Sequence, residues 1–363
     1  MIQLKDLCQK ASSNIAQKDL EGHEGQYPIY GASGLIGYVD FYKQENPYVA
    51  VVKDGAGIGR VMCLPEKSSV IGTMQYILPN EGVNVHYLAF AMEHMNLAKY
   101  FSGATIPHIY FKDYGKEKLL ERTEKEQKSI AEILSKMDSL ISLRKQQLAK
   151  LDELVKARFV EMFGDPVANI ANWPIERLEK HLTIIGGYAF KSDGFRAKGI
   201  PVLRIGNINS GYFQPTNMVY WHDDSTLERY KMHPGDLVIS LTGTVGKNDY
   251  GNVCILGNDY SEYYLNQRNA KLELNETLNG IYLSELLKFP QIKGRLTGIS
   301  RGIRQANISN KDILSLPILI PPISLQKQFA AFVERVEWQK QTVQQSLEKL
   351  ELMKKALMQE YFG

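Results

Sequence analysis

The chain has 363 residues and a formal net charge of +3, with 44% hydrophobic and 23% charged residues. This composition is typical of a folded protein and excludes an intrinsically disordered one. The length allows two ordinary domains with connecting elements. Because the net charge is small, nucleic-acid binding would have to depend on local groups rather than on a strongly basic surface.

The number and spacing of the cysteines and the hydropathy of the chain predict the compartment in which the protein is located. Cys8, Cys63 and Cys254 are odd in number and widely spaced, which argues against a disulfide framework or a structural zinc site. The first ten residues, MIQLKDLCQK, carry charges where a signal peptide has its apolar core. The most apolar stretch, 313–323, is too short to span a membrane, and we interpret it as a buried strand leading into a linker. We therefore expect a cytoplasmic protein with no membrane association.

Residues 1–120 are predicted to form a first α/β domain. Short apolar runs alternate with Gly-rich turns, as in YVAVVKDGAGIG at 48–59 followed by RVMCL at 60–64. Glycine adopts positive φ angles and allows a close approach of the backbone to a partner. The pattern therefore predicts two strands joined by a Gly-rich loop.

Residues 121–164 are predicted to form a first long helix. From Glu124 to Phe159 there is neither Pro nor Gly, and apolar residues recur at heptad spacing. Thr123 followed by Glu126 is a capping-box pattern, and the block ends at a Phe-Gly pair. The seam residues of this helix are Ile130, Met137, Leu148 and Leu151.

Residues 165–320 repeat the pattern of the first domain, and 321–363 repeat that of the helix. DLVISLTGTVG at 236–246 followed by NVCIL at 252–256 resembles the Gly-rich loop of the first domain. Pro321-Pro322 leads into the second helix, with Ser324 as its expected N-cap. The seam residues of this helix are Phe329, Val336, Leu347 and Leu350.

An internal repeat relates the two halves. An offset of 199 residues aligns 103–164 with 302–363, with 17 identities in 62 ungapped positions, where about 4 would be expected by chance from this composition. Each helix of about 36 residues would be about 54 Å long, which exceeds what one small domain can cover. We therefore expect an α/β (α+β) fold of two domains separated by two long helices, which form an antiparallel coiled coil in a pseudo-two-fold repeat.

The sequence contains no recognisable catalytic or cofactor motif. Gly246-Lys247 is followed by Asn248, so a P-loop is excluded, and neither a dinucleotide fingerprint nor a closely spaced His/Cys cluster occurs. The motifs of amino-methyltransferases are also absent. We therefore predict no catalytic residue, no metal site and no cofactor on this chain.

The loops of both domains are instead rich in side chains that contact DNA. Arg reads guanine, Asn and Gln read adenine, and Lys and backbone amides hold phosphates. The cluster at 301–307 is the strongest candidate, and Thr105 and His108 occupy nearly corresponding positions in the first domain. The candidate DNA-binding residues are Tyr30, Ser33, Lys53, Thr105, His108 and Tyr110 in the first domain, and Arg204, Asn207, Thr242, Thr244, Lys247, Gln267, Arg268, Arg301, Arg304, Gln305 and Asn307 in the second.

Over nearly its full length the chain resembles the specificity subunits of type I restriction-modification systems. Each globular segment closes with a G-x-x-x-x-x-I-x-x-K-D stretch, followed by a Gln-Lys-led helix that ends in Phe-Gly. The segments 27–38, 200–211 and 235–246 also look like target-recognition domains of that family.

The resemblance implies a non-catalytic DNA-binding protein. Each domain would read one half of a bipartite double-stranded DNA site, and the coiled coil would set the spacer between the halves. Two methyltransferase subunits and the restriction subunits would be the partners. S-adenosylmethionine and ATP would be bound by those partners.

Two alternatives differ in what they predict. A DNA-modifying enzyme with a divergent catalytic site would transfer methyl groups or cleave DNA as an isolated chain. A coiled-coil scaffold without a DNA role would bind no DNA sequence, and it would leave the paired polar loops unexplained.

Overall fold

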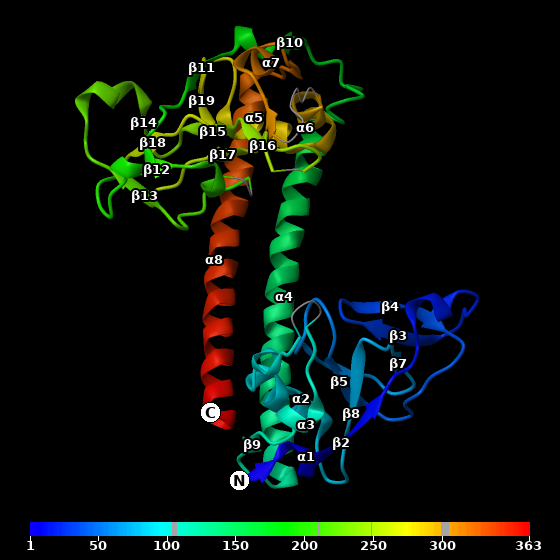
Figure 1. The fold of residues 1–363 in the computed structure, drawn as a ribbon. Helices are drawn as coiled ribbons and strands as arrows, with labels where there is room; N and C mark the ends of the chain where they lie inside the picture. The colour runs from blue at the N-terminus through cyan, green and yellow to red at the C-terminus, as the bar shows by residue number, and fades with distance from the viewer. Residues whose placement is uncertain (104–106, 209–210, 248, 299–304) are drawn as a thin grey trace. The chain divides into compact units, whose positions relative to one another are not determined.

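The computed structural model describes residues 1–103, 107–208, 211–247, 249–298 and 305–363 (Figure 1). The chain divides into two compact units. The first unit contains Met1–Gln147 and Val343–Gly363, and the second contains Leu148–Thr342. Each long helix contributes residues to both units, whereas the predicted boundaries treat each helix as a segment of its own.

The first unit is built on an antiparallel four-stranded sheet. Its central strand alternates between two apolar clusters: Val49 and Val51 pack with helix α2, whereas Tyr48, Ala50 and Val52 pack on the other face. All five residues are buried, because both faces of the sheet are covered. The strand order is β2 (Cys8–Ser12), β8 (Met74–Pro79), β5 (Tyr48–Val52) and β6 (Val61–Leu64), and α2 spans Val85–His94.

Smaller elements complete the first unit. A three-stranded sheet has the order β4-β3-β7, and a two-stranded sheet joins β1 to β9. Their bounds are β1 (Ile2–Gln3), β3 (Tyr27–Gly31), β4 (Gly34–Val39), β7 (Ser69–Val70) and β9 (Lys118–Leu119), with short helices α1 (Leu4–Leu7), η1 (Gln17–Leu20), η2 (Leu97–Tyr100) and α3 (Phe111–Tyr114).

The second unit repeats this plan. Its main sheet has the order β11-β19-β15-β17 and its smaller sheet the order β13-β12-β18-β14. The main-sheet strands and the helices after them are β11 (Leu182–Gly186), β15 (Leu237–Ser240), β17 (Val253–Ile255), β19 (Asn269–Leu274), α5 (Gly280–Lys288) and α6 (Pro290–Thr297). The remaining strands and α7 are β10 (Ile175–Arg177), β12 (Ile200–Leu203), β13 (Val219–Trp221), β14 (Lys231–Met232), β16 (Thr242–Thr244), β18 (Tyr263–Leu265), β20 (Gln305–Asn307), α7 (Asn310–Leu314) and β21 (Pro317–Leu319). The 3-10 helices are η3 (Leu178–Lys180), η4 (Ser192–Gly194), η5 (Ile205–Asn207) and η6 (Ser225–Tyr230).

The repeat extends to the direction of the strands that both units share, while the smaller sheet of the second unit has one additional strand, β14. Strand β3 pairs antiparallel with β4 and parallel with β7, just as β12 pairs antiparallel with β13 and parallel with β18. The Gly-rich loops join β5 to β6 and β15 to β17, and each pair is antiparallel. The predicted α/β domains and hairpins are therefore confirmed.

The long helices are α4 (Glu124–Phe163) and α8 (Ile323–Phe362), each of 40 residues. In the first unit Lys354 Nζ lies 2.7 Å from Asp138 Oδ1, and Lys145 Nζ lies 2.9 Å from Glu351 Oε1. In the second unit Lys340 Nζ lies 2.7 Å from Asp152 Oδ1. Because residue numbers rise along α4 as those of their partners fall along α8, the two helices are antiparallel within each unit (Figure 1). The predicted antiparallel pairing is confirmed.

The seam residues differ in burial and in what they contact. Ile130 and Phe329 lie in the apolar cores of their units. The buried seam residues are Ile130, Met137, Phe329, Val336 and Leu347, and the half-buried ones are Leu148, Leu151 and Leu350.

The two helix starts had different outcomes. Thr123 N donates to Glu126 Oε2 at 2.8 Å and Glu126 N donates to Thr123 Oγ1 at 3.3 Å, which confirms the capping box. The N-cap prediction for Ser324 is wrong, because α8 begins at Ile323. The carbonyl of Pro322 accepts the first helical hydrogen bond, from Leu325 N at 2.9 Å, so the helix starts earlier than the serine. Among the described helices, none combines the length and the hydropathy needed to cross a membrane.

Candidate nucleic-acid interface

In the first unit, candidate residues meet where β5 ends. Asp54 and His108 form an antiparallel bridge, and His108 Nδ1 lies 2.6 Å from Asp54 Oδ1. Lys53 Nζ donates to the other carboxylate oxygen. Burial of Asp54 by itself raises the pKa of its carboxyl, but the hydrogen bonds from Lys53 and His108 outweigh burial and hold that pKa below its ordinary value. Asp54 is therefore an anion that fixes Lys53 and His108 beside each other.

Tyr110 extends this cluster on the solvent side. Tyr110 is 49% exposed, and its ring stacks on that of His108 with 6.5 Å between centroids. Lys112 Nζ lies 5.3 Å from the centre of the same ring. An exposed aromatic ring beside cations can stack on a base while the cations contact phosphates.

The turn between β3 and β4 lies against the loop between β5 and β6. Arg60 Nη1 donates to Ala32 O at 2.6 Å, next to the exposed Ser33. A Cβ on Gly59, whose φ is +81°, would lie 2.5 Å from Ala98 N, so the loop requires glycine there. Tyr30 is half-buried against the apolar cluster around β5 and contributes mainly to the core.

In the second unit the parallel strands β12 and β18 end side by side. Arg204 follows β12, and the exposed Gln267 and Arg268 follow β18. Leu241 N donates to Arg268 O at 2.9 Å, which places this turn next to Thr242. The structure thus brings together candidates that are separated by more than 60 residues in sequence.

Strands β16 and β20 form the continuation of this surface. Thr242 pairs with Asn307 and Thr244 pairs with Gln305. Thr244 N and Oγ1 donate to the carboxylate of Asp249 at 2.8 and 2.9 Å, and these hydrogen bonds lower the pKa of Asp249. Lys247 is exposed, and its backbone N–H donates a hydrogen bond to Thr244 O at 3.0 Å, which fixes the backbone of the turn.

Asn207 has a structural position. Its side chain is buried, accepts a hydrogen bond from Arg204 N at 3.0 Å, and donates to Gln214 O and Thr216 O, each at 3.0 Å. A base contact by Asn207 would require this loop to open, so its side chain is not available to DNA in this structure. Thr105, Arg301 and Arg304 lie outside the described residues.

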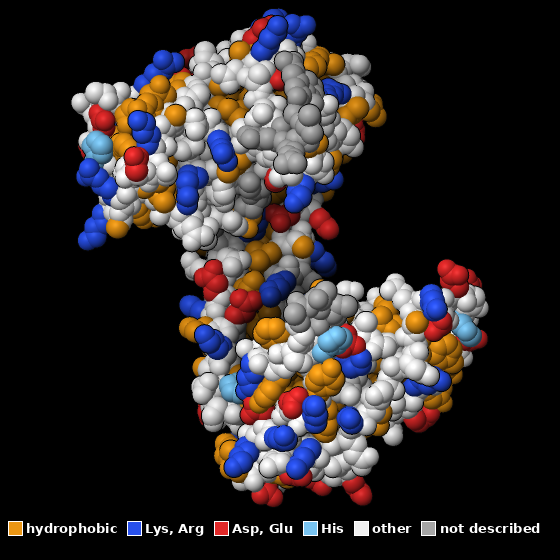
Figure 2. All heavy atoms as spheres, viewed as in Figure 1, with side chains coloured by type: hydrophobic (Ala, Val, Ile, Leu, Met, Phe, Trp, Pro, Cys, Tyr) orange, Lys and Arg blue, Asp and Glu red, His pale blue; other side chains and the backbone are white. Residues whose placement is uncertain are grey.

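Asp54, Arg60 and Asp249 belong to these surfaces and were not predicted. Asp54 and Asp249 are carboxylates, and the predicted DNA-binding set contains none; Arg60 has a suitable residue type but was not part of that set. The signal available in the sequence was the Lys53-Asp54 pair directly after an apolar strand. In the face seen in Figure 2, Lys and Arg side chains are interspersed with Asp and Glu, which fits the small net charge.

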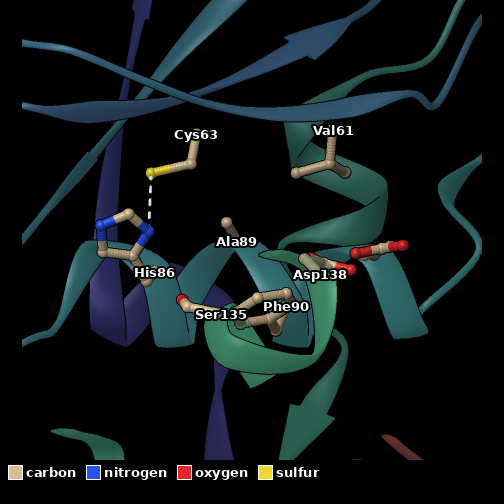
Figure 3. A pocket seen from close by; sticks show the side chains of 8 residues that line it. Val61, Cys63, His86, Ala89, Phe90, Ser135 and Asp138 are labelled. Atoms are coloured by element: carbon tan, nitrogen blue, oxygen red, sulfur yellow. Dashed lines mark hydrogen bonds between the residues drawn. The ribbon is translucent and has the colours of Figure 1, made fainter. Parts of the chain in front are cut away.

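The first unit also contains a pocket of about 280 Å³ between β6, α2 and α4 (Figure 3). Cys63 Sγ lies 3.4 Å from His86 Nδ1, but burial raises the pKa of the thiol to about 11, so it stays protonated near neutral pH. The carboxylates of Glu93 and Asp138 both pair with Lys354. We assign no reaction to this pocket.

Among the described residues, no group of three or more His, Cys, Asp or Glu side chains is arranged to hold a metal ion.

Comparison with known proteins identifies the family of the chain. The type I restriction modification DNA specificity domain matches residues 1–153 and 171–352. The chain belongs to this family. The predicted resemblance and the predicted role in DNA sequence specificity are thereby confirmed, and the two matched segments correspond to the two halves of the repeat.

Individual relatives agree with this assignment. The chain is 24% identical to the type I restriction enzyme MjaVIII specificity subunit of Methanocaldococcus jannaschii, over 98% of this chain and 89% of that protein. It is also 24% identical to the EcoKI specificity subunit of Escherichia coli, over 58% of this chain and 48% of that one. The crystal structure of a type I restriction-modification S subunit from M. genitalium has the same fold, with a TM-score of 0.64 and 16% identity, covering 100% of this chain and 95% of that one.

Proposed function

We propose that this specificity protein reads a bipartite DNA site, with each unit reading one half. The observation that carries the proposal is the repeat itself. The two units share strand order and strand direction, yet they present different polar side chains at the same edge. A shared scaffold with different contact residues is what two unlike half-sites require.

The proposed contacts divide by chemistry. Lysines and the turns that carry them would hold phosphates, while side chains with amide, hydroxyl, imidazole or guanidinium groups would reach base edges. The DNA-facing set in the first unit is Ser33, Lys53, His108 and Tyr110, and in the second Arg204, Thr242, Thr244, Lys247, Gln267, Arg268 and Asn307.

Methyltransferase and restriction subunits are the proposed protein partners, with two methyltransferase subunits per chain. In the first unit Leu140 and Leu143 of α4 are 43% and 58% exposed, and such apolar side chains on a helix surface suit a protein partner. A net charge of only +3 leaves much of the phosphate contact to those partners. S-adenosylmethionine and ATP would be bound by the partners, and this chain would carry neither a cofactor nor a catalytic residue.

The paired helices are proposed to set the spacer between the half-sites. Residues 141–147 and 343–349 form one heptad on each helix, joined by the hydrogen bond from Arg144 Nε to Ser346 Oγ at 3.2 Å. None of these residues except Val343 and Leu347 is fully buried, and neither segment contributes to the apolar cluster of the first unit. Deleting both segments shortens the paired helices by about 10 Å, which is the length of about three base pairs of DNA.

Methylome sequencing of a host that carries this chain and its methyltransferase tests the proposal. The unaltered chain should give a bipartite motif with an unread spacer, and the double deletion should shorten the spacer by about three base pairs without changing either half-site. Deleting 141–147 alone is the matched control, because it shifts the helices out of register and should abolish methylation. An unchanged spacer after the double deletion would refute the proposal that the paired helices set the spacer length. A continuous motif would refute the proposal that the DNA site is bipartite.

A further inference from the structure

One backbone arrangement occurs in both units at the candidate interface. In the first unit Asp54 bridges His108, and Ile109 N donates to Lys53 O at 3.0 Å. In the second unit Thr242 pairs with Asn307, and Ile308 N donates to Leu241 O at 2.8 Å. His108 and Asn307 are separated by the repeat offset of 199 residues, so the two pairs occupy equivalent positions.

The residues beneath these pairs are apolar in both units. Ile109 and Ile308 are 2% and 4% exposed and pack into the cores of their units. The pairs above them reach solvent: the His108 side chain is 37% exposed and Asn307 is exposed. These backbone hydrogen bonds are thus the same in both units, and the outward side chains of the two pairs differ.

We infer that these two equivalent pairs, Asp54 with His108 and Thr242 with Asn307, determine base specificity in their respective half-sites. The inference rests on the proposed function, in which each unit reads one half-site. At these pairs one backbone hydrogen-bonding pattern presents different side chains in the two units, so they can explain how one scaffold reads two sequences.

The two pairs offer different hydrogen bonds to a base. The amide of an asparagine matches adenine with one donor and one acceptor. In the first unit His108 uses Nδ1 for Asp54, so a base contact falls to Nε2 and is a single hydrogen bond. Asp54 acts here as a positioning residue. We therefore expect the base preference of a half-site to change when the side chains of its pair are exchanged for those of the other pair.

The test transfers the chemistry of the second pair to the first. A variant with Asp54→Thr and His108→Asn is assembled with its methyltransferase, and methylation is measured on DNA in which each half-site is randomised in turn. One position of one half-site should shift to A·T, with discrimination of about ten- to a hundredfold. The other half-site and the spacer should stay as in the unaltered chain.

Two further variants make the test specific. The reciprocal change, Thr242→Asp with Asn307→His, should alter only the other half-site. His23 and Asp40 form a second His–Asp pair in the first unit, with 2.8 Å between Nδ1 and Oδ1, at the open end of the β3–β4 hairpin and opposite its turn at Ser33. His23→Asn with Asp40→Thr should therefore leave both half-sites unchanged.

The outcomes distinguish a failure of this inference about the two residue pairs from a failure of the proposed bipartite function. If the folded transfer variant keeps the original base preference at every position, the inference is wrong while the bipartite reading stands. Should thermal melting show that the transfer variant is unfolded, His108→Ala replaces it, and unchanged discrimination by that variant overturns the inference. If the unaltered chain with its methyltransferase produces no motif, the proposed function itself fails.

Discussion

The two units share their interior and differ at the edge that carries the candidate DNA-binding residues. In the first unit Gln127 Oε1 accepts a hydrogen bond from Asn84 N at 3.0 Å and its Nε2 donates to Arg122 O at 3.1 Å. In the second unit Gln326 Oε1 accepts from Asn279 N at 2.8 Å and its Nε2 donates to Pro321 O at 2.8 Å. Both glutamines are buried, and both asparagines cap the helix that covers the main sheet.

The edge follows the opposite pattern. An acid and an imidazole stand in the first unit where a hydroxyl and an amide stand in the second. A buried amide without its partners is costly, so the interior tolerates little change, whereas exposed side chains at the edge can vary without disturbing the core. The comparison shows that the side chains at the edge differ while the scaffold is retained.

The largest expected effect is a loss of stability that is confined to the core of one unit. In the second unit Phe159 packs against Phe163, Tyr282, Phe289 and Phe329. Phe159→Ala should destabilise that unit by about 3 to 5 kcal/mol, because the cavity cannot fully collapse. Hydrogen exchange resolved by unit measures the effect. Exchange that accelerates equally in both units would show that their cores are not independent.

Met358 is the equivalent residue of the first unit by the repeat offset, and it is 8% exposed at the end of α8. Met358→Ala should cost less than Phe159→Ala, about 2 kcal/mol, since a flexible side chain at the margin of a core leaves a smaller cavity. It serves as the matched control. A larger loss for Met358→Ala would contradict the view that the aromatic cluster makes the second core the tighter of the two.

An intermediate effect should be equal in the two units. Gln127→Ala and Gln326→Ala each leave a partly buried backbone N–H, that of Asn84 or of Asn279, without its acceptor, which costs about 1 to 3 kcal/mol. Thermal melting with hydrogen exchange should therefore show similar losses, each confined to the unit that carries the change. Strongly unequal losses would mean that the conserved geometry does not reflect a conserved energetic role.

The smallest effect concerns pH. Burial raises the pKa of Cys8 and Cys254 to about 12 and that of Cys63 to about 11, from an ordinary value of 9.0. Because the folded thiols stay protonated while unfolded thiols ionise, stability is unaffected below about pH 9 and falls as the pH rises from there toward 12. The free energy of unfolding as a function of pH measures this.

The same thiols report on the two units chemically. Iodoacetamide at pH 9 should label the half-buried Cys63 first, and Cys8 and Cys254 only after denaturation. Rapid labelling of Cys254 in the folded protein would show that the core of the second unit opens more readily than its packing implies.

Much of the architecture could be predicted because it depends on periodic patterns. Heptad spacing without Pro or Gly predicted α4 and α8, and the offset of 199 residues predicted that both units share one plan. The start of α8 was misplaced because a backbone carbonyl, at Pro322, acts where a serine cap was expected.

The interface was less predictable because its contacts are distant in sequence. Asp54 and His108 meet only when β5 and the segment after Pro107 pair, and no local pattern indicates this. Asn207 had the residue type of a base-reading side chain, but its amide hydrogen-bonds to its own loop. Residue type alone cannot separate an amide that builds a loop from one that faces DNA.

The most direct test of the account is to exchange residues 166–310 for the corresponding segment of another family member and to sequence the methylome of a host carrying the hybrid and the methyltransferase. We expect one half-site to change to that of the donor, with the other half-site and the spacer unchanged. A hybrid in which both half-sites change would contradict the claim that each unit reads its own half of the DNA site.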